Sequence, residues 1–486
     1  MQSGRDASVA VIGAGLAGLS AADALINRHG FATVKIYEAS DRVGGRILTT
    51  NFGDGKVEIG AQYVQKVSNS PIYKYAVQKN LLCKSEPLHI ALRQDGTIVD
   101  KRLADSFWNF ALSTEDKAEQ FSKRLPKKAD HSFGSVMRYQ YDSWRTKNSK
   151  KWKASELADF DRLLVFAEKV AELDYGCVDW VDVSTVSSKA FHTGGSQQVE
   201  LVHVDHRKGG YGAYVQQLAQ KLPKDCIKFN HLVTGINWVG PRVELDFENG
   251  TGTSVDHVIV TVPVGYLKQF GQHMFSPPLP TSKLLALDGI GFGAVEKVFA
   301  RFTEPFWDPN VATYDLLWDR PQGWESEELT LARSFSVLQP VPGLPNVICL
   351  WATGPAVDVV YTTTDNELAQ AIQGLVRTFF VNADNMAPIE MTRSRWGADF
   401  LFLGSYSYYN VNYDVHQHGP KQLAEPLYGP DDETPLVLFA GEATSDDSYG
   451  TTHGAYLSGQ REAQRLNQFY QKNHKNSKSN KRRLFK

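Results

Sequence analysis

The segment VAVIGAGLAG, residues 9–18, constrains the fold more than any other part of the sequence. It sets Gly13, Gly15 and Gly18 in G-x-G-x-x-G spacing, between a short apolar run and the helical stretch LSAADALINR. Such a loop lets the backbone approach a pyrophosphate at the amino end of a helix. The next predicted strand, ATVKIYEAS, reaches Glu38, 20 residues after Gly18, where a dinucleotide fold places the carboxylate that accepts the ribose hydroxyls. The segment therefore predicts a strand–loop–helix unit that binds a dinucleotide.

The bulk composition is that of a globular protein with more than one core. At 486 residues the chain is expected to form two domains or one large composite domain. The first apolar run is broken by glycines within a few residues, and none reaches the roughly 18 residues of a spanning helix, so neither a signal peptide nor a membrane anchor is expected. Four scattered cysteines without a C-x-x-C pair favour buried thiols in a reducing compartment. No metal-ligand spacing or Walker loop is evident, so we expect no metal site.

Charge is distributed unevenly along the chain. The net charge is −2, but the segment 471–486 holds seven Lys and Arg and no acid, which leaves about −9 (−2 − 7) on the remainder. An acidic body favours cationic ligands. The basic tail is expected to be disordered and solvated, with a nuclear or polyanion-binding signal as the alternative. The chain ends in Leu-Phe-Lys and not in the peroxisomal address Ser-Lys-Leu, so we expect a cytoplasmic protein that is also nuclear if KRR acts as a signal.

A second glycine pair follows the predicted strand that reaches Glu38. In ASDRVGGRILT, the glycines Gly44 and Gly45 allow a close backbone approach, and Arg46 adds a guanidinium suited to a second phosphate. At this point residues 8–468 resemble the flavin-dependent amine oxidases, which include monoamine oxidases, polyamine and spermine oxidases and lysine-specific histone demethylases. The resemblance rests on motifs in family order: VIGAGLAGLSAA, EASDRVGGR, EIGAQYV, PPLP, GFGAVEKVFARFTEPFW, GSYSY, FAGEAT and TTHGAYLSGQREA. It is strongest toward animal polyamine and spermine oxidases, and it implies FAD as the cofactor.

The resemblance also implies the fold class. We expect an α/β, two-domain flavoprotein with a discontinuous, doubly wound FAD-binding domain and a mixed-sheet and helical substrate domain. The FAD-binding domain is expected over 1–86, 196–277 and 404–470, and the substrate-binding domain over 87–195 and 278–403. The oligomeric state stays open, with a monomer as one possibility.

Roles for individual residues follow from the resemblance only where the motifs match. Besides the glycine loop, these positions are implied to contact FAD: Ala17, Glu38, Gly45, Arg46, Gln62, Tyr63, Val233, Glu442 and Thr452. Thr451 and Thr452 begin a helix whose amino end is implied to face the flavin pyrimidine, where N–H donors suit negative charge. Ser405 stands where monoamine oxidases attach their flavin through a cysteine. A serine cannot form that thioether, so the FAD is expected to be bound non-covalently.

Four residues are assigned to the catalytic site: Lys297, Tyr406, Gln65 and Thr451. Lys297 lies in the predicted strand VEKVF between apolar neighbours, so its amine is expected to be partly buried; alternatively, its stem packs and its amine reaches solvent. The resemblance implies that Lys297 holds a water at flavin N5. Tyr406, in GSYSY, is implied to form one aromatic wall of the amine site, and its ring face can attract a cation. Core packing is the alternative for an isolated tyrosine in such a stretch.

Two departures bear on the substrate. Gln65 stands where animal polyamine oxidases carry histidine and plant enzymes glutamate, and it can form hydrogen bonds but cannot titrate. Gly450, before Thr451, stands where the animal enzymes have serine. We predict oxidation of a small cationic amine, with spermine, spermidine or their N-acetylated forms expected, through hydride transfer to the flavin. Oxygen then yields hydrogen peroxide, and the imine hydrolyses to an aldehyde and a shorter amine. The alternatives are another amine, such as a monoamine or an amino acid, or a non-catalytic flavin-binding scaffold.

Overall fold

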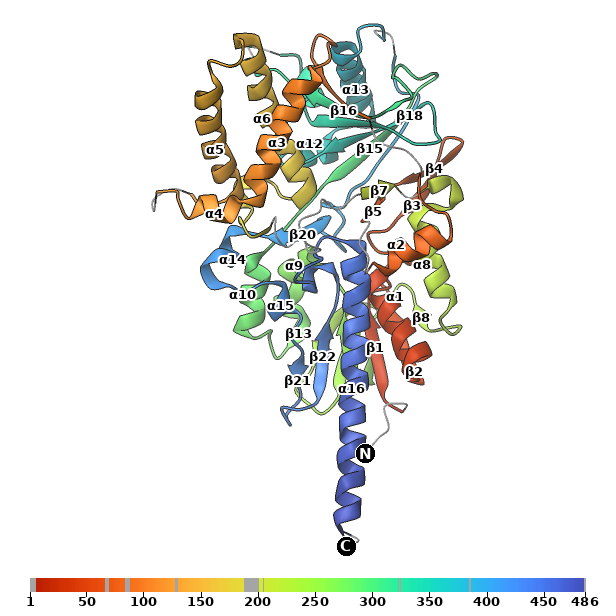
Figure 1. The fold of residues 1–486 in the computed structure, drawn as a ribbon. Coiled ribbons are helices and arrows are strands. Elements are labelled where there is room, and N and C mark those ends of the chain that lie inside the picture. Colours follow the sequence, from red (N-terminus) through yellow and green to blue (C-terminus); the bar gives the residue numbers. More distant parts are fainter. Residues whose placement is uncertain are drawn as a thin grey trace.

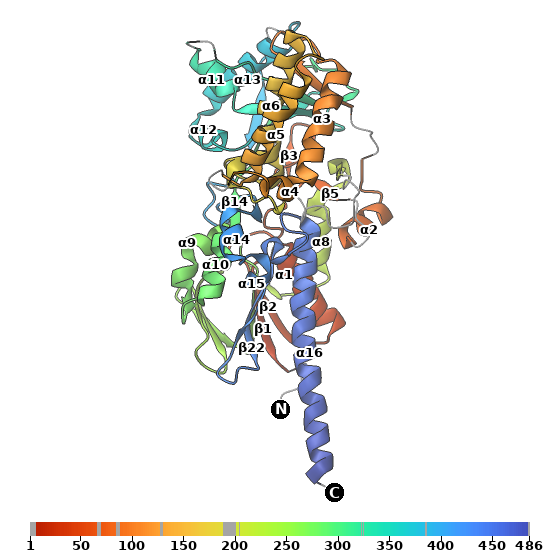
Figure 2. The ribbon, with the colours of Figure 1, turned by 60° about the vertical axis from the view of Figure 1, so that its left-hand side comes forward.

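The computed structural model is an elongated molecule with one large sheet toward each end and a helix that projects beyond the lower sheet (Figures 1 and 2). It describes residues 6–65, 70–83, 88–126, 130–187, 201–203, 205–321, 323, 325–383 and 386–484. The expected α/β class with mixed sheets and a helical layer is confirmed.

The lower sheet has six strands in the order β21-β22-β12-β1-β2-β8. Its core strands are parallel and β21 is antiparallel. The strands are β1 (Ser8–Ile12), β2 (Thr33–Tyr37), β8 (Ile227–Lys228), β12 (His257–Val260), β21 (Leu427–Tyr428) and β22 (Pro435–Phe439). Every residue of β12 and β22 is buried, as expected for parallel strands covered on both faces.

Helices cover one face of the lower sheet and a smaller sheet covers the other. The first core joins the sheet to α1 (Leu16–Asp23), α8 (Gly210–Gln220) and α16 (Thr452–Leu484). The second core lies under the four-stranded sheet β11-β10-β9-β13 and under α9. These elements span β9 (Val233–Asn237), β10 (Val243–Phe247), β11 (Gly252–Val255), β13 (Phe275–Ser276) and α9 (Val264–Met274). The small residues of α1 allow it to pack closely along α16.

The upper sheet has the order β19-β15-β18-β17-β16-β6. Its strands are β6 (Leu88–Arg93), β15 (Glu296–Arg301), β16 (Val311–Leu317), β17 (Phe335–Pro340), β18 (Val347–Ala352) and β19 (Glu390–Arg393). One face packs against α3 (Lys101–Asp116), α5 (Phe133–Asn148) and α6 (Ala154–Tyr175), and α4 (Ala118–Ser122) lies beside them. The opposite face packs against α13 (Asp365–Phe379), flanked by α11 (Glu327–Ala332) and α12 (Ala356–Thr362).

Short elements connect the two sheets. They are β3 (Thr49–Phe52), β4 (Gly55–Glu58), β5 (Tyr63–Gln65), β7 (Leu201–His203), β14 (Ile290–Gly293), β20 (Tyr406–Tyr409), α2 (Pro71–Gln78), α10 (Thr281–Gly289), α14 (Val411–His416) and α15 (Pro420–Leu423). Single turns lie at Ala24–Arg28, Trp180–Asp182, His206–Lys208 and Glu442–Thr444. Among the described residues, no helix is both long enough and apolar enough to cross a bilayer.

The strands of the two large sheets fall into the two sets of segments expected from the sequence, while the domain boundaries themselves stay predictions. Two boundaries fall in segments 84–87 and 188–200, outside the described residues. At the boundary near residue 278, α10 and β14 contribute to the core of the lower sheet, and α10 packs against α14 and α15.

α16 continues to Leu484, into the segment 471–486 for which disorder is expected, and that disorder stays a prediction. This stretch contains no glycine or proline that would end the helix.

Candidate functional site

One cavity of about 410 Å³ brings together nearly all of the predicted site residues. Those that line it are Gly13, Gly15, Ala17, Glu38, Gly45, Arg46, Gln62, Tyr63, Gln65, Val233, Lys297, Tyr406, Glu442, Thr451 and Thr452. They come from the carboxyl ends of β1 and β2, from the connecting segments, from the upper sheet and from the start of α16. Gly18 does not line the cavity. The cavity thus lies where the lower sheet meets the upper one.

The glycine loop has the geometry that a pyrophosphate requires. A Cβ at Gly18 would lie 2.0 Å from the carbonyl oxygen of Gly13, so only glycine lets α1 pack this closely against the loop. At Gly15, nothing lies within 4 Å of the position that a Cβ would occupy. Because Gly15 borders the cavity and immediately precedes α1, a side chain there would fill space at the helix amino end. This cradle fits the phosphates of a dinucleotide.

Glu38 is fixed at the end of β2 by three hydrogen bonds. Its carboxylate accepts the N–H of Ala14 at 2.6 Å and, from Ser40, the N–H at 2.9 Å and the hydroxyl at 2.7 Å. The side chain is buried, yet it borders the cavity near Val233. Its place beside the glycine loop is the one expected for a carboxylate that binds ribose hydroxyls.

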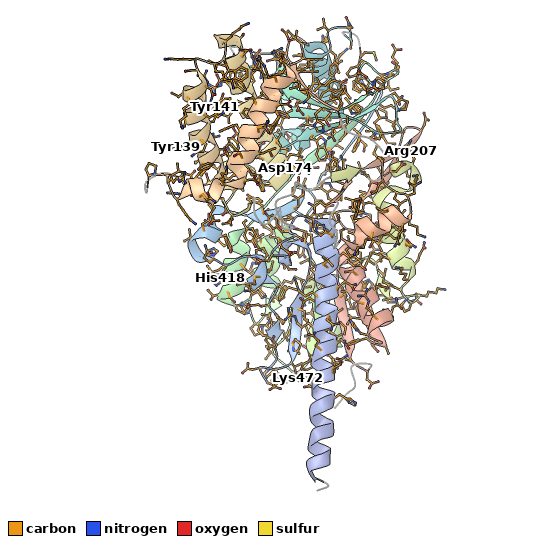
Figure 3. All side chains as sticks on the ribbon, viewed as in Figure 1. Tyr139, Tyr141, Asp174, Arg207, His418 and Lys472 are labelled. Atoms are coloured by element: carbon orange, nitrogen blue, oxygen red, sulfur yellow. The ribbon has the colours of Figure 1, made fainter. Side chains whose placement is uncertain are left out.

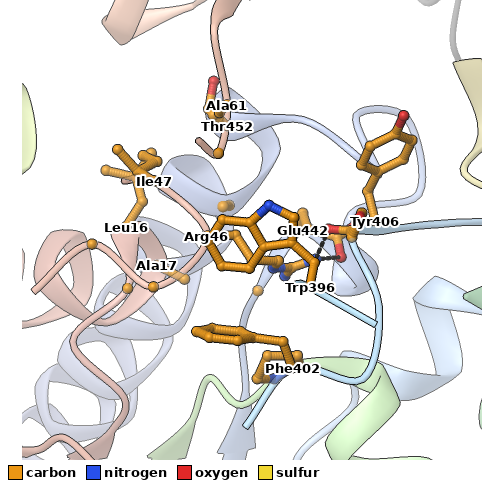
Figure 4. Close-up of a pocket in the computed structure, with 18 of the residues that line it drawn as sticks. Leu16, Ala17, Arg46, Ile47, Ala61, Trp396, Phe402, Tyr406, Glu442 and Thr452 are labelled. Atoms are coloured by element: carbon orange, nitrogen blue, oxygen red, sulfur yellow. Dashed lines mark hydrogen bonds and ion pairs between the residues drawn. The ribbon is translucent and has the colours of Figure 1, made fainter. Parts of the chain in front are cut away.

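Arg46, which follows the second glycine pair, forms an ion pair with Glu442, which follows β22 (Figure 4). Arg46 donates to Glu442 Oε1 at 2.9 Å and to the carbonyl oxygen of Ser405 at 2.6 Å. The other carboxylate oxygen of Glu442 accepts the N–H of Gly450 at 2.7 Å and the hydroxyl of Ser407. Gly450 has φ +67°, a conformation that favours glycine over the serine of the animal enzymes. The departure at this position is therefore compatible with the local backbone.

Lys297 is buried, and its ammonium donates to three protein oxygens. They are the carbonyl oxygens of Glu58 at 2.9 Å and Gly60 at 2.6 Å, and Gln62 Oε1 at 2.6 Å. The ammonium also lies 4.7 Å from the centroid of the Trp351 ring. Burial lowers the pKa of Lys297, while these oxygens favour the charged form. A lysine has three N–H donors, so a water at Nζ requires one of the three bonds to be exchanged.

Aromatic rings line the cavity beside Lys297. The Tyr406 hydroxyl donates to the carbonyl oxygen of Leu173, and burial raises the pKa of Tyr406 well above its ordinary value, so the ring stays neutral. Trp396 and Phe402 meet edge-to-face with centroids 5.1 Å apart, and both reach the cavity (Figure 4). The structure thus offers apolar surfaces against which a flat ring system and an amine can pack.

The start of α16 faces the same cavity. Thr451 Oγ1 accepts the N–H of Gly454 at 3.0 Å and donates to the carbonyl oxygen of Ser448 at 2.6 Å, so Thr451 caps the helix. Thr452 Oγ1 lies 3.0 Å from the Tyr211 hydroxyl. The helix amino end therefore presents its dipole to whatever occupies the cavity.

Gln65 and Ser405 also border the cavity. Gln65 ends β5 and pairs with Leu201 of β7. The Ser405 hydroxyl accepts the N–H of Val295 at 2.9 Å and donates to the Val295 carbonyl oxygen at 3.0 Å, so it stabilises the local backbone.

An acidic residue that no sequence motif points to, Asp174, lies in the cavity wall at the last turn of α6. Figure 3 labels it near the middle of the molecule. Its side chain is exposed to the cavity but enclosed by protein, and it forms no hydrogen bond or ion pair with any described residue. This enclosure raises the pKa of Asp174 to about 7, and nearby Glu115 adds to the increase. In the sequence Asp174 looks like an ordinary surface charge; the one local signal is Gly176, which ends the helix with φ +65°.

Comparisons with known proteins agree with this site. A family model described as "Flavin containing amine oxidoreductase" matches residues 16–467. The bovine "Peroxisomal N(1)-acetyl-spermine/spermidine oxidase" is 29% identical, with 95% of each chain covered. "Polyamine oxidase 1" from rice is 31% identical and covers 95% of this chain and 97% of its own. A solved structure of putrescine oxidase bound to putrescine has a TM-score of 0.69 at 18% identity, covering 95% of this chain and 99% of its own, which shows the shared fold. The chain belongs to the family of flavin-containing amine oxidoreductases, whose cofactor FAD fits the observed cradle without a covalent link.

Proposed function

We propose that the protein oxidises polyamines, with oxygen as the electron acceptor and FAD as the cofactor. The observation that carries the proposal is Asp174, an unpaired carboxyl in the cavity wall near Tyr406. A carboxylate there attracts a cationic amine, while Tyr406, Trp396 and Phe402 provide apolar and ring surfaces for its carbon chain. The similarity to enzymes named as polyamine oxidases points the same way.

The chain's own residues bind, orient and enclose the reacting amine. FAD, when bound, supplies the two-electron oxidation of the carbon beside the amine nitrogen and the later reaction with oxygen. Asp174 holds the ammonium form close to the site, and the wall formed by the buried Lys297 and the partly buried Tyr406 keeps bulk water away. Arg46 and Glu442 hold the other end of the cavity wall in place, because each of them forms hydrogen bonds with more than one partner.

A substrate panel tests the proposal. Purified protein loaded with FAD is assayed for hydrogen peroxide with spermine, spermidine, their N-acetylated forms, benzylamine and a set of amino acids. We expect the highest kcat/KM for one of the polyamines. The proposal would be refuted if only benzylamine or only an amino acid, and no polyamine, gave peroxide release. It would also be refuted if the flavin-loaded protein released no peroxide with any amine.

Location is a separate proposal. We infer a cytoplasmic protein with access to the nucleus, supported by the basic segment 471–486 that includes Lys481, Arg482 and Arg483. The bovine relative carries "peroxisomal" in its name, so a peroxisomal location is the outcome to test against. A fluorescent tag at the amino terminus leaves the basic segment free, and punctate peroxisomal fluorescence would refute the inference.

A further inference from the structure

The face of the upper sheet that carries Lys297 continues across the sheet as a row of paired residues. Lys297 pairs with Trp351, Trp351 with Val337, and Val337 with Asp315. Residues directly paired between antiparallel strands point to the same face. All four side chains therefore point to the face that α3 and α6 cover. Since neighbouring strands lie about 4.8 Å apart, Asp315 is roughly 14 Å from Lys297 across the sheet.

A chain of hydrogen bonds runs beside this row. Gln62, which accepts from Lys297 at 2.6 Å, donates through Nε2 to Gln339 Oε1 at 3.3 Å. Gln339 in turn donates through Nε2 to Thr313 Oγ1 at 3.3 Å. Thr313 precedes Asp315 by two positions on β16, so both side chains share a face. Neutral polar groups thus lead from the cavity toward Asp315 through a face that is otherwise apolar.

Asp315 is a buried carboxyl with no protein partner among the described residues. Only 8% of its surface is exposed, and its carboxyl has no hydrogen bond or ion pair with any residue that the structure describes. Burial raises its pKa to about 7. A buried ionised carboxylate without a partner is costly, and a cationic ligand would relieve that cost.

We propose that Asp315 binds the distal ammonium of an extended polyamine whose reacting end lies beside Tyr406 and Lys297. The proposal rests on the proposed oxidation of polyamines and specifies which members of that class fit. Since Gln339, Thr313 and Asp315 do not line the cavity, a chain with several amine groups reaches Asp315 only by displacing side chains of this face, with inner amines beside Gln339 and Thr313. A monoamine cannot reach both ends. Asp315 would therefore be a specificity-determining residue that favours long polyamines.

The test compares three variants of the FAD-loaded enzyme. Asp315→Asn removes the charge at nearly constant volume, and Asp315→Glu keeps it. Asp319→Asn is the matched control, because Asp319 lies four positions further along and is bound by Arg162 at 2.6 Å. For each, peroxide release gives KM and kcat with spermine and with benzylamine, and calorimetric titration of the anaerobic enzyme with its FAD already reduced gives the Kd for spermine, because reduced flavin cannot oxidise the amine.

We expect Asp315→Asn to raise both KM and Kd for spermine at least tenfold, with kcat within about twofold and benzylamine kinetics unchanged. Asp315→Glu should recover part of the spermine affinity, and Asp319→Asn should match the wild type. The inference would be overturned if Asp315→Asn left the Kd for spermine unchanged or raised the KM for both amines equally. A wild type that does not bind spermine would also overturn it. The titration needs no turnover, so a wild type that binds spermine without releasing peroxide refutes the proposed oxidation while Asp315 is still tested.

Discussion

Asp315→Asn should change how stability depends on pH, even without any amine present. The carboxyl of an unfolded chain ionises near pH 3.8, whereas burial in the folded protein raises the pKa of Asp315 to about 7. Between these values the folded state binds more protons than the unfolded state, so the wild type loses stability as the pH rises from about 4 to about 7. The asparagine variant lacks this titration and should not share that loss.

The magnitude follows from the pKa difference. A change from 3.8 to about 7 is about 3.2 units, and about 3.2 × 1.36 gives roughly 4 kcal/mol. This value is an upper limit, because water entry and local relaxation reduce the cost of a buried charge. Relative to the wild type, the free energy of unfolding of Asp315→Asn should therefore rise by up to about 4 kcal/mol between pH 4 and pH 7 and then stay constant.

Thermal unfolding of the FAD-loaded protein measures this effect. The Tm of wild type, Asp315→Asn and the control Asp319→Asn is recorded at about pH 5, 6, 7 and 8 in the absence of amines. The Tm of Asp315→Asn should rise by several degrees relative to the wild type over this range, whereas Asp319→Asn should follow the wild type. A gap between wild type and Asp315→Asn that does not vary with pH would refute the assignment of Asp315 as a buried, unpaired acid.

Three further predictions concern the cavity. Lys297→Met should retain FAD but slow the reaction with oxygen by about 10²-fold or more, as followed by stopped flow; unchanged reoxidation would assign Lys297 to packing. Asp174→Asn should raise the KM for spermine about tenfold with a smaller change in kcat, and an unchanged KM would remove Asp174 from the amine site. Because Ser405 cannot form a thioether, acid precipitation should release all flavin into the supernatant, and flavin in the pellet would contradict non-covalent binding.

The parts of the site that depend on local sequence could be predicted. The parts that depend on how β-strands pair, and in which register, could not. The glycine loop and Glu38 follow from spacing within one strand–loop–helix unit. Lys297 and Tyr406 were placed in the site through their motifs, and both line the cavity. Asp315 was not considered, because its place in the row with Lys297 depends on how four consecutive strands pair, in the order β15-β18-β17-β16, and on the register of each pair.

Burial of charged groups was also hard to foresee. Asp174 ends a helix whose other acids pair with lysine or arginine, as Glu172 does with Lys169, so its sequence context suggests a solvent-exposed acid. Its enclosure results from where the end of α6 meets β20 at the cavity. For the tail after residue 471, composition alone does not decide between disorder and helix, because charge does not end a helix when no glycine or proline does.

The surroundings of Lys297 connect its predicted role with the polar chain toward Asp315. Two of its three acceptors are backbone carbonyl oxygens, of Glu58 and Gly60, which are fixed by the chain segment that carries them. The third, Gln62 Oε1, belongs to a side chain that can rotate. A water that binds Lys297 Nζ therefore replaces Gln62 at the lowest cost. Since Gln62 also donates to Gln339, this exchange would alter the polar groups proposed to contact an extended amine, so Lys297 and Gln339 are coupled through the amide of Gln62.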